Sequence, residues 1–255
     1  MKVFLLSTRI PLLIIYYIIH KNLFIGFFYK FFFNNFYYKN LVFNLKSFRL
    51  PISNYSSFFV NTYEYNDRIL IEKYINKKNN CIIIGGGLGF IATLCFIKSQ
   101  KKILIFEIDK SICDNLTQNL YRNSCKFSLY NNNLFINNKH NKIFKKYKYF
   151  FYHNDFLSNS AYRKSNKIFR VENITPSRIF DFNKFNTLVI DAEGMEKYYI
   201  KNIKFLNNIH YLFFEMHYDL LNFKETKKIH KTLINNNFFL VDKCFNSFFY
   251  KKKFA

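Results

Sequence analysis

The sequence predicts an α/β fold built on a mostly parallel sheet with helices on both faces. From residue 64 onward, short apolar runs alternate with helical patterns of about ten residues, as expected of buried parallel strands. A glycine-rich turn follows the first of these runs, and acidic residues follow later ones. The length of 255 residues suits one such domain with an extension. In these sheets, ligands bind beyond the carboxyl ends of the strands.

The expected elements follow from the apolar runs and their spacing. The main strands are expected at Cys81–Ile84, Ile103–Glu107, Lys126–Tyr130, Thr187–Ile190 and Tyr211–Glu215, with a terminal antiparallel hairpin of Phe238–Val241 and Phe245–Tyr250. The helices are expected at Arg68–Asn76, Phe90–Lys98, Ser111–Tyr121, Met195–Phe205 and Lys224–Asn235. Tyr147–Tyr152 and Ile168–Val171 are expected to be extended, and Asn131–Asn141 to be a loop.

The composition is strongly basic and aromatic. The 39 Lys and Arg residues outnumber the 16 Asp and Glu residues, which gives a net charge of +23. Because the lysines are spread over the whole chain and no arginine-rich stretch occurs, we expect no nucleic-acid partner. No pair of cysteines has disulfide-motif or metal-site spacing, so we expect a reducing, cytoplasmic location and no zinc site. The cysteines are Cys81, Cys95, Cys113, Cys125 and Cys244.

Residues 1–60 are predicted to form a basic, aromatic-rich helical extension, and residues 61–255 the ligand-binding domain. No acidic residue precedes Glu64, and two apolar runs, Ile10–Ile19 and Leu23–Phe33, lie in this segment. The first run is too short to span a bilayer, and Lys30 interrupts the second. Two interpretations stay open: a pair of helices covering the domain, or a peripheral membrane contact through residues 1–50. A cleaved signal peptide is a third, weaker alternative.

The glycine-rich loop is the first candidate ligand site. Four of the six glycines lie between positions 85 and 89, and the loop reads Gly85, Gly86, Gly87, Leu88 and Gly89. A loop that leaves a strand and opens a helix presents backbone N–H groups to a ligand. Phe90 occupies the place of the third glycine of a dinucleotide fingerprint, so the usual dinucleotide arrangement is not expected. The alternative is a structural turn that binds nothing.

Glu107 ends the second predicted strand. An acid at this position, about twenty residues beyond the first glycine, is suited to accept hydrogen bonds from a ribose diol. Ile108 follows it and is expected to line the same ligand. A solvent-exposed strand end is the alternative interpretation of Glu107.

An acidic segment follows the strand Thr187–Ile190. It contains Asp191, Glu193 and Glu196, with Gly194 between the two glutamates. Grouped carboxylates raise one another's pKa, which suits a general base, although Glu193 and Glu196 are also placed to stabilise the start of a helix. Three carboxylates would suffice to hold a divalent cation, but nothing in the sequence demands a metal, and none is expected.

These motifs together resemble the FkbM-type methyltransferases. The resemblance rests on Ile84–Phe90, Phe106–Glu107, the segment Asp191-Ala192-Glu193-Gly194-Met195-Glu196, and the strand end Phe213–His217, and it covers about residues 64–250. It implies a class I methyltransferase (Rossmann-like) fold with a seven-stranded sheet. It also implies S-adenosylmethionine as the methyl donor and a hydroxyl acceptor on a sugar or similar small molecule. One departure is Ile83, where the family commonly has an aspartate.

The resemblance and the strand ends suggest roles for the site residues. Asp191 is the expected catalytic base, with Glu215 and His217 as alternates. Two other interpretations stay open. Ile83 favours an inactive methyltransferase-like binding module, and the glycine run alone would also fit a nicotinamide- or flavin-dependent oxidoreductase.

Overall fold

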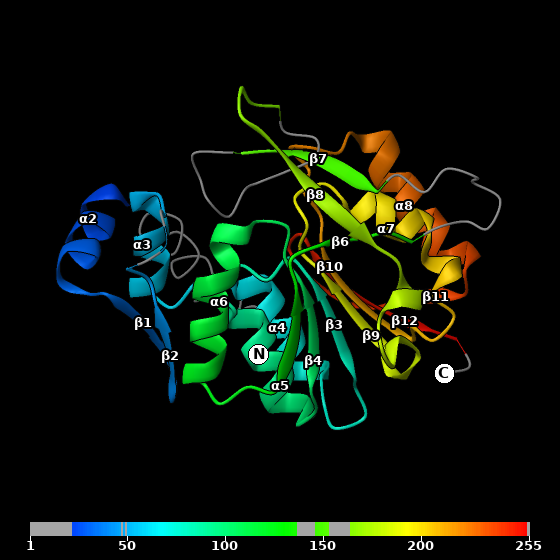
Figure 1. The fold of residues 1–255 in the computed structure, drawn as a ribbon, viewed down its shortest axis with the longest axis horizontal. Coiled ribbons are helices and arrows are strands. Elements are labelled where there is room, and N and C mark those ends of the chain that lie inside the picture. The colour runs from blue at the N-terminus through cyan, green and yellow to red at the C-terminus, as the bar shows by residue number, and fades with distance from the viewer. Residues whose placement is uncertain (1–21, 47, 49, 137–145, 153–163, 254–255) are drawn as a thin grey trace, which may run out of the picture. The chain divides into compact units, whose positions relative to one another are not determined.

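The computed structural model describes residues 22–46, 48, 50–136, 146–152 and 164–253 (Figure 1). The chain divides into two compact units, the first ending at Tyr65 and the second beginning at Asn66. The predicted apolar run Ile10–Ile19 lies outside the described residues. No helix within the described ranges is long and apolar enough to cross a membrane.

The first unit combines two helices with a short hairpin. Its elements are α2 (Leu23–Phe32), β1 (Asn35–Tyr38), β2 (Leu41–Asn44) and α3 (Ile52–Phe59). The prediction of a helical extension was therefore incomplete, since β1 and β2 pair in antiparallel register. The hairpin is held by an aromatic core in which Phe36 and Phe43 are fully buried and Phe36 lies 5.1 Å from Phe58, ring to ring. The sequence did not predict this hairpin, because the aromatic residues that pack against it are not distinguishable from the many other aromatic residues of the chain.

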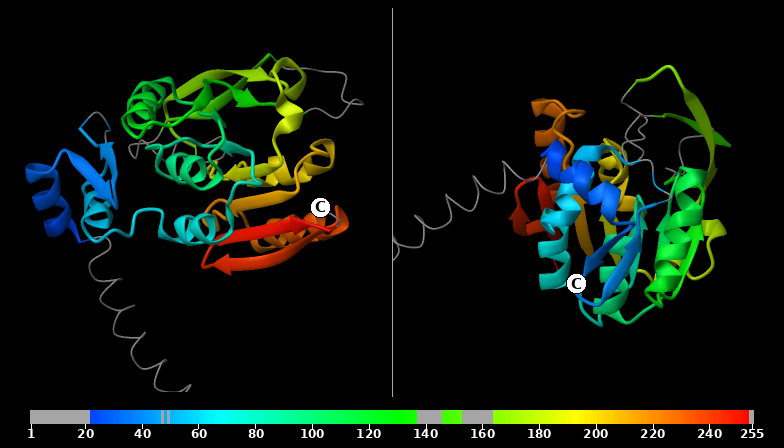
Figure 2. Two further views of the ribbon diagram at one scale, coloured as in Figure 1. Left: turned by 90° about the horizontal axis from the view of Figure 1, so that it is seen from below. Right: turned by 90° about the vertical axis from the view of Figure 1, so that its left-hand side faces the viewer.

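The second unit contains a seven-stranded sheet with the order β11-β12-β10-β9-β3-β4-β5. Six strands run in one direction, and only β12, between β10 and β11, runs antiparallel to its neighbours. The strands are β3 (Cys81–Ile84), β4 (Ile103–Phe106), β5 (Phe127–Tyr130), β9 (Thr187–Ile190), β10 (Tyr211–Glu215), β11 (Phe238–Cys244) and β12 (Ser247–Lys252). The hairpin of β11 and β12 and the strands β4 and β5 lie at opposite edges (Figure 2).

Helices cover both faces of this sheet, with α4, α5 and α6 on one side and α7 and α8 on the other (Figure 1). They are α4 (Tyr65–Tyr74), α5 (Phe90–Ser99), α6 (Lys110–Arg122), α7 (Glu196–Lys201) and α8 (Phe223–Asn235). Because β3, β4 and β9 are covered on both faces, all of their residues are buried. The predicted α/β fold with a mostly parallel seven-stranded sheet and a terminal antiparallel hairpin is confirmed.

A second, three-stranded sheet has the order β6-β8-β7. Its strands are β6 (Asn133–Leu134), β7 (Tyr147–Phe151) and β8 (Ile168–Ile174). The two extended segments were predicted, but the loop expected at Asn131–Asn141 was wrong for β6. The backbone of Asn133 and Leu134 pairs with Asn173 and Ile174, forty residues away, and the asparagine-rich sequence gives no local sign of that pairing.

The helix predicted at Met195–Phe205 is shorter than expected. Helix α7 ends at Lys201, and a 3-10 turn follows at Ile203–Phe205. Ile200 of α7 and Ile203 of the turn both belong to the core cluster that contains residues of β9 and β10. Packing thus sets the end of the helix.

Candidate active site

The site lies where β3 and β9 end, side by side. Strands β4 and β5 extend the sheet on one side of this pair, and β10 and β12 extend it on the other, so this is the point where strand order reverses. The hydrogen-bond ladder continues past the strands: the N–H of Asp191 donates to the carbonyl of Ile84 at 3.0 Å, and that of Gly85 donates to the carbonyl of Phe106 at 2.9 Å. The first residues after β3 and β9 are therefore fixed by the sheet itself.

The glycine turn is tight because of what surrounds it. Gly85 has φ +89°, and a Cβ there would overlap the backbone carbonyl of Asp191. Gly89 has φ +86°, forms the N-cap of α5, and has Leu116 against its Cα. These two positions require glycine for conformation and for close packing. The loop therefore packs against the residue that follows β9 and against α6, and its backbone is also available to a ligand.

Leu88 is fully buried, and its carbonyl accepts a hydrogen bond from the Asn119 side chain at 3.0 Å. The sequence predicts that Leu88 belongs to the ligand loop, but its side chain is buried in the core. Leu88 can therefore contribute only backbone atoms to a ligand site at this turn.

Glu107 is buried at the end of β4, with 5% of its surface exposed. Its Oε2 accepts the N–H groups of Gly86 at 2.9 Å and Gly87 at 3.3 Å, and its Oε1 accepts the N–H of Asp109 at 2.9 Å. Burial raises the pKa of this carboxyl, while the three backbone donors oppose the shift. Glu107 thus ties the glycine loop to the end of β4. The ribose contact stays a prediction.

Ile83 and Ile108 flank these groups. Ile83, 1% exposed, lies in register with Ile105 of β4 and Val189 of β9, so its side chain belongs to the core of the sheet. A core residue therefore stands where the resemblance to the FkbM-type methyltransferases implies an aspartate. Ile108 is partly exposed, and its carbonyl accepts a hydrogen bond from Asn131 at 3.1 Å.

The acidic segment after β9 makes a sharp turn. Glu193 has φ +46° and Gly194 has φ +92°, so two successive residues take left-handed conformations. For Glu193 this conformation costs about 1 kcal/mol. The turn brings Asp191, Glu193 and Glu196 around a single imidazole, that of His217.

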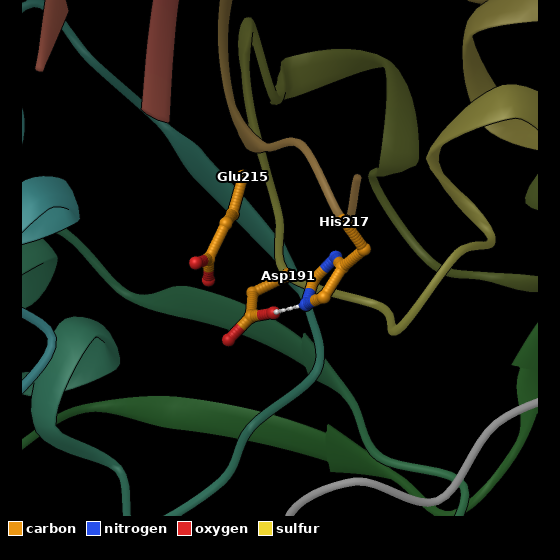
Figure 3. A group of neighbouring side chains, drawn as sticks. All are labelled: Asp191, Glu215 and His217. Carbon is orange, nitrogen blue, oxygen red and sulfur yellow. Dashed lines mark ion pairs between the residues drawn. The ribbon is translucent and has the colours of Figure 1, made fainter. Parts of the chain in front are cut away.

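His217 lies two residues beyond β10 and is the centre of the cluster (Figure 3). Its Nε2 lies 3.6 Å from Oδ1 of Asp191 and 3.6 Å from Oε1 of Glu193, and its Nδ1 lies 3.1 Å from Oε1 of Glu196. Glu196 is fully buried, and its Oε1 also accepts the N–H of Ala192 at 3.1 Å. The predicted site residues Asp191, Glu215 and His217 therefore meet, together with both glutamates of the acidic segment.

The charges of the cluster shift one another's pKa. The carboxylates of Glu193, Glu196 and Asp191 outweigh the opposing effect of burial and raise the pKa of His217 to about 12. Desolvation and the negative charge of Glu215 raise the pKa of Asp191 well above its usual range. The pKa of Glu215 is raised by burial. At neutral pH, His217 is therefore an imidazolium.

Glu215 is positioned by asparagines that the sequence analysis did not identify. Asn246, in the turn between β11 and β12, donates to Oε1 of Glu215 at 2.6 Å, and Asn66 donates to Oδ1 of Asn246 at 2.8 Å. In a chain so rich in asparagine, neither residue stands out. Asn246 could have been found from its position in the sequence, because the turn of the terminal hairpin lies opposite the end of β10.

Lys148 of β7 is a second residue that the sequence analysis missed. Its ammonium lies 2.7 Å from Sδ of Met195 and 5.0 Å from the ring centre of Tyr198. Burial, reinforced by the charge of Lys197, lowers its pKa to about 8. The side chain reaches the residue directly before α7, so β7 brings a cation close to the acidic segment.

Comparison with known proteins gives structural similarity only. The sequence matches no protein-family profile, and no curated protein is significantly similar to it. A ribosomal protein L11 methylase from Lactobacillus delbrueckii subsp. bulgaricus is 14% identical, with a TM-score of 0.44 over 73% of this chain and 76% of that chain. A putative RNA methyltransferase from Pyrococcus horikoshii is 11% identical, with a TM-score of 0.40 over 80% and 86%.

A third structure, P. horikoshii TYW2 in complex with MeSAdo, is 9% identical, with a TM-score of 0.37 over 72% of this chain and 59% of that chain. These values are too low to transfer an activity or a substrate. The fold class rests on the sheet of the chain itself, whose strand order and antiparallel β12 are those of the class I, Rossmann-like methyltransferase fold. Membership of the FkbM-type family stays a prediction.

Replacing Gly85 should destabilise the protein more than replacing its neighbour. Gly85→Ala places a Cβ against the carbonyl of Asp191 at a positive φ, so we expect the free energy of unfolding to fall by at least about 2 kcal/mol. Gly86→Ala meets side-chain atoms of Leu116, Ile105 and Glu107 but no backbone atom, and should cost about 1 kcal/mol. Urea denaturation of both variants measures the free energy of unfolding. An equal decrease in the two variants would contradict the close contact between Gly85 and the carbonyl of Asp191.

His217 should remain protonated well above neutral pH. Because its pKa is raised from 6.5 to about 12, its stabilising contribution is complete below pH 6.5 and declines as the pH rises toward 12. At pH 7, His217→Gln should lower the free energy of unfolding by about 3 kcal/mol. The difference from wild type should shrink by pH 10. Nitrogen NMR of the imidazole checks the protonation directly, and a titration near pH 6.5 would refute it.

Proposed function

We propose that the chain is an S-adenosylmethionine-dependent methyltransferase of the FkbM type that methylates a hydroxyl of a sugar or similar small molecule. The observation that carries this proposal is the adjacency of the Gly85–Gly89 turn and the Asp191–Glu196 segment at the point where strand order reverses. A ligand at the turn and an acceptor at the acidic segment would lie next to one another.

The residues present fit the proposed methyl donor. The turn carries glycines held in left-handed conformations, Glu107 lies behind it, and Ile108 is partly exposed beside it. Gly85–Gly89, Glu107 and Ile108 are therefore the proposed binding residues. When bound, S-adenosylmethionine supplies an electrophilic methyl group. The carboxylate of Glu107 holds the turn in place through Gly86 and Gly87, so the loop is ordered before any ligand arrives.

Asp191 is the proposed general base. Its side chain is 40% exposed, so an acceptor can reach it, and a raised pKa makes its carboxylate a stronger base. His217 is already protonated and cannot take a further proton, and Glu215 is held by Asn246. The charge on His217 and the hydrogen bond to Glu215 therefore favour Asp191 over the two alternates. Asp191 would accept the proton of the acceptor hydroxyl as the oxygen takes the methyl group, and the methyl–sulfur bond would break to release S-adenosylhomocysteine.

A hydroxyl acceptor suits this arrangement because its proton has to be removed during transfer. The imidazolium of His217, 3.6 Å from Asp191, keeps a positive charge next to the carboxylate that performs this step. Two other functions remain as alternatives. Ile83 in the core of β3 favours an inactive binding module, whereas Phe90, 1% exposed at the start of α5, argues against a dinucleotide-dependent oxidoreductase.

Titration calorimetry with S-adenosylmethionine tests the proposal. We expect saturable binding with a Kd below about 1 mM, and the absence of binding at that concentration would remove it. Asp191→Asn should keep the affinity within about threefold but lower turnover on a panel of hydroxyl acceptors by at least about 100-fold. Asp242→Asn, which breaks a surface ion pair with Lys73, is the control. Binding without turnover on any acceptor would favour the inactive module.

We further propose that the first unit contacts an anionic membrane surface through α2. The exposed side chains of this helix are almost all apolar: Phe24 is 82% exposed, Phe27 61% and Phe31 75%. Residues 1–63 contain no acidic side chain, and Lys30 lies within the helix. An aromatic helix surface with only basic charges around it suits the interface of anionic lipids.

Vesicle sedimentation tests this contact. The full chain should sediment with phosphatidylserine-containing vesicles, and the triple variant Phe24→Ser, Phe27→Ser, Phe31→Ser should lose at least about tenfold in binding. Phe180→Ser, which removes an 87% exposed phenylalanine from the second unit, should bind as wild type does. Equal binding of the triple variant and the control would show that α2 is not the contact.

A further inference from the structure

Three side chains at the carboxyl ends of β9 and β10 are arranged as a set of metal ligands. One ligand atom each of Asp191, Glu215 and His217 lies within 4.8 Å of the other two. The two carboxylates and the imidazole come from adjacent strands and point toward a common region (Figure 3). Two oxygen donors and one nitrogen donor on one side of an ion leave its remaining positions open.

The imidazole is oriented for this role by a group outside the set. Nδ1 of His217 donates to Oε1 of Glu196, which leaves Nε2 facing Asp191. Histidine ligands to metals commonly donate their other N–H to a carboxylate in this way. Fixing Nδ1 selects Nε2 as the coordinating atom.

Glu196 adds a buried negative charge beside the same imidazole. It is fully buried, and its Oε2 has no hydrogen-bond partner among the described residues. With Asp191, Glu193 and Glu215, four carboxylates surround one imidazole. A buried carboxylate oxygen without a partner is costly, and a divalent ion at Nε2 of His217 would add positive charge near this group.

We propose that Asp191, Glu215 and His217 bind a divalent transition-metal ion, with Glu196 as the positioning residue for His217. A mixed set of two carboxylates and one imidazole suits Mn²⁺ or Zn²⁺ better than Mg²⁺, which prefers oxygen ligands alone. Asn246 keeps one oxygen of Glu215 in a hydrogen bond, so its other oxygen is the ligand. On binding, Nε2 gives its proton to solvent and its lone pair to the metal.

The consequence for catalysis rests on the proposed function. An open metal position beside Asp191 would hold an acceptor hydroxyl and lower its pKa, which makes removal of its proton easier. Binding of the metal itself depends on none of this, because the ligands belong to the chain alone.

Mn²⁺ titration followed by electron paramagnetic resonance tests the metal site. The chelator-treated full chain, without S-adenosylmethionine, should bind one Mn²⁺ with a Kd below about 1 mM, and Mn²⁺ should broaden the imidazole NMR signals of His217. Glu215→Gln and Asp191→Asn should each weaken binding at least about tenfold. Excess Zn²⁺ should displace Mn²⁺ from the wild-type chain.

Asp181→Asn is the matched control, because Asp181 pairs with Lys184 at the exposed surface. It should bind Mn²⁺ as wild type does. Thermal unfolding of each variant establishes that it is folded, and if one ligand variant fails to fold, the other carries the test. The absence of a saturable site in the wild-type chain, or equal affinity in the ligand variants and the control, would overturn the proposal. Because no methyl donor is present, this outcome is separate from that of the proposed methyl transfer.

Discussion

The close approach of Gly85 to the backbone of Asp191 is the constraint on which the site depends. Strands β3 and β9 run parallel and in register, so their ends coincide, and the chain after β3 can turn there only if no side chain intervenes. That contact puts the glycine loop and the first acidic residue next to one another. The ladder bonds to Ile84 and Phe106 then fix both ends in place. Any chemistry between a ligand of the loop and a ligand of the acidic segment follows from this geometry.

The second feature of the site is the concentration of charge in a chain that is otherwise basic. Residues from the end of β9, the start of α7 and the end of β10 surround His217, and the fully buried Glu196 fixes one side of its ring. An imidazolium among carboxylates stabilises the folded cluster, but it removes His217 from the list of bases. Displacing its Nε2 proton by a metal would exchange one positive charge for two. His217 and the carboxylates around it would therefore determine both the stability of the site and its affinity for a metal.

The sequence predicted the main sheet and the meeting of the site residues well, since the strands are short, mostly apolar runs and Asp191, Glu215 and His217 lie at or just beyond the ends of two of them. It predicted less of what packing decides. Strand β6 needs its partner forty residues away, and the hairpin of the first unit needs an aromatic core. Asn246 and Lys148 gave no signal, because asparagine and lysine are common throughout the chain. Glu107 was predicted at the end of the second strand, but its three backbone partners could not be foreseen, because they depend on the folded loop.

A crystal structure of the full chain with S-adenosylhomocysteine would show whether the glycine loop and the acidic segment form one site. We expect the ligand on the Gly85–Gly89 turn, with its sulfur directed toward Asp191. A ligand bound elsewhere, or one on the turn with its sulfur directed away from the acidic segment, would show that the two segments do not form one site.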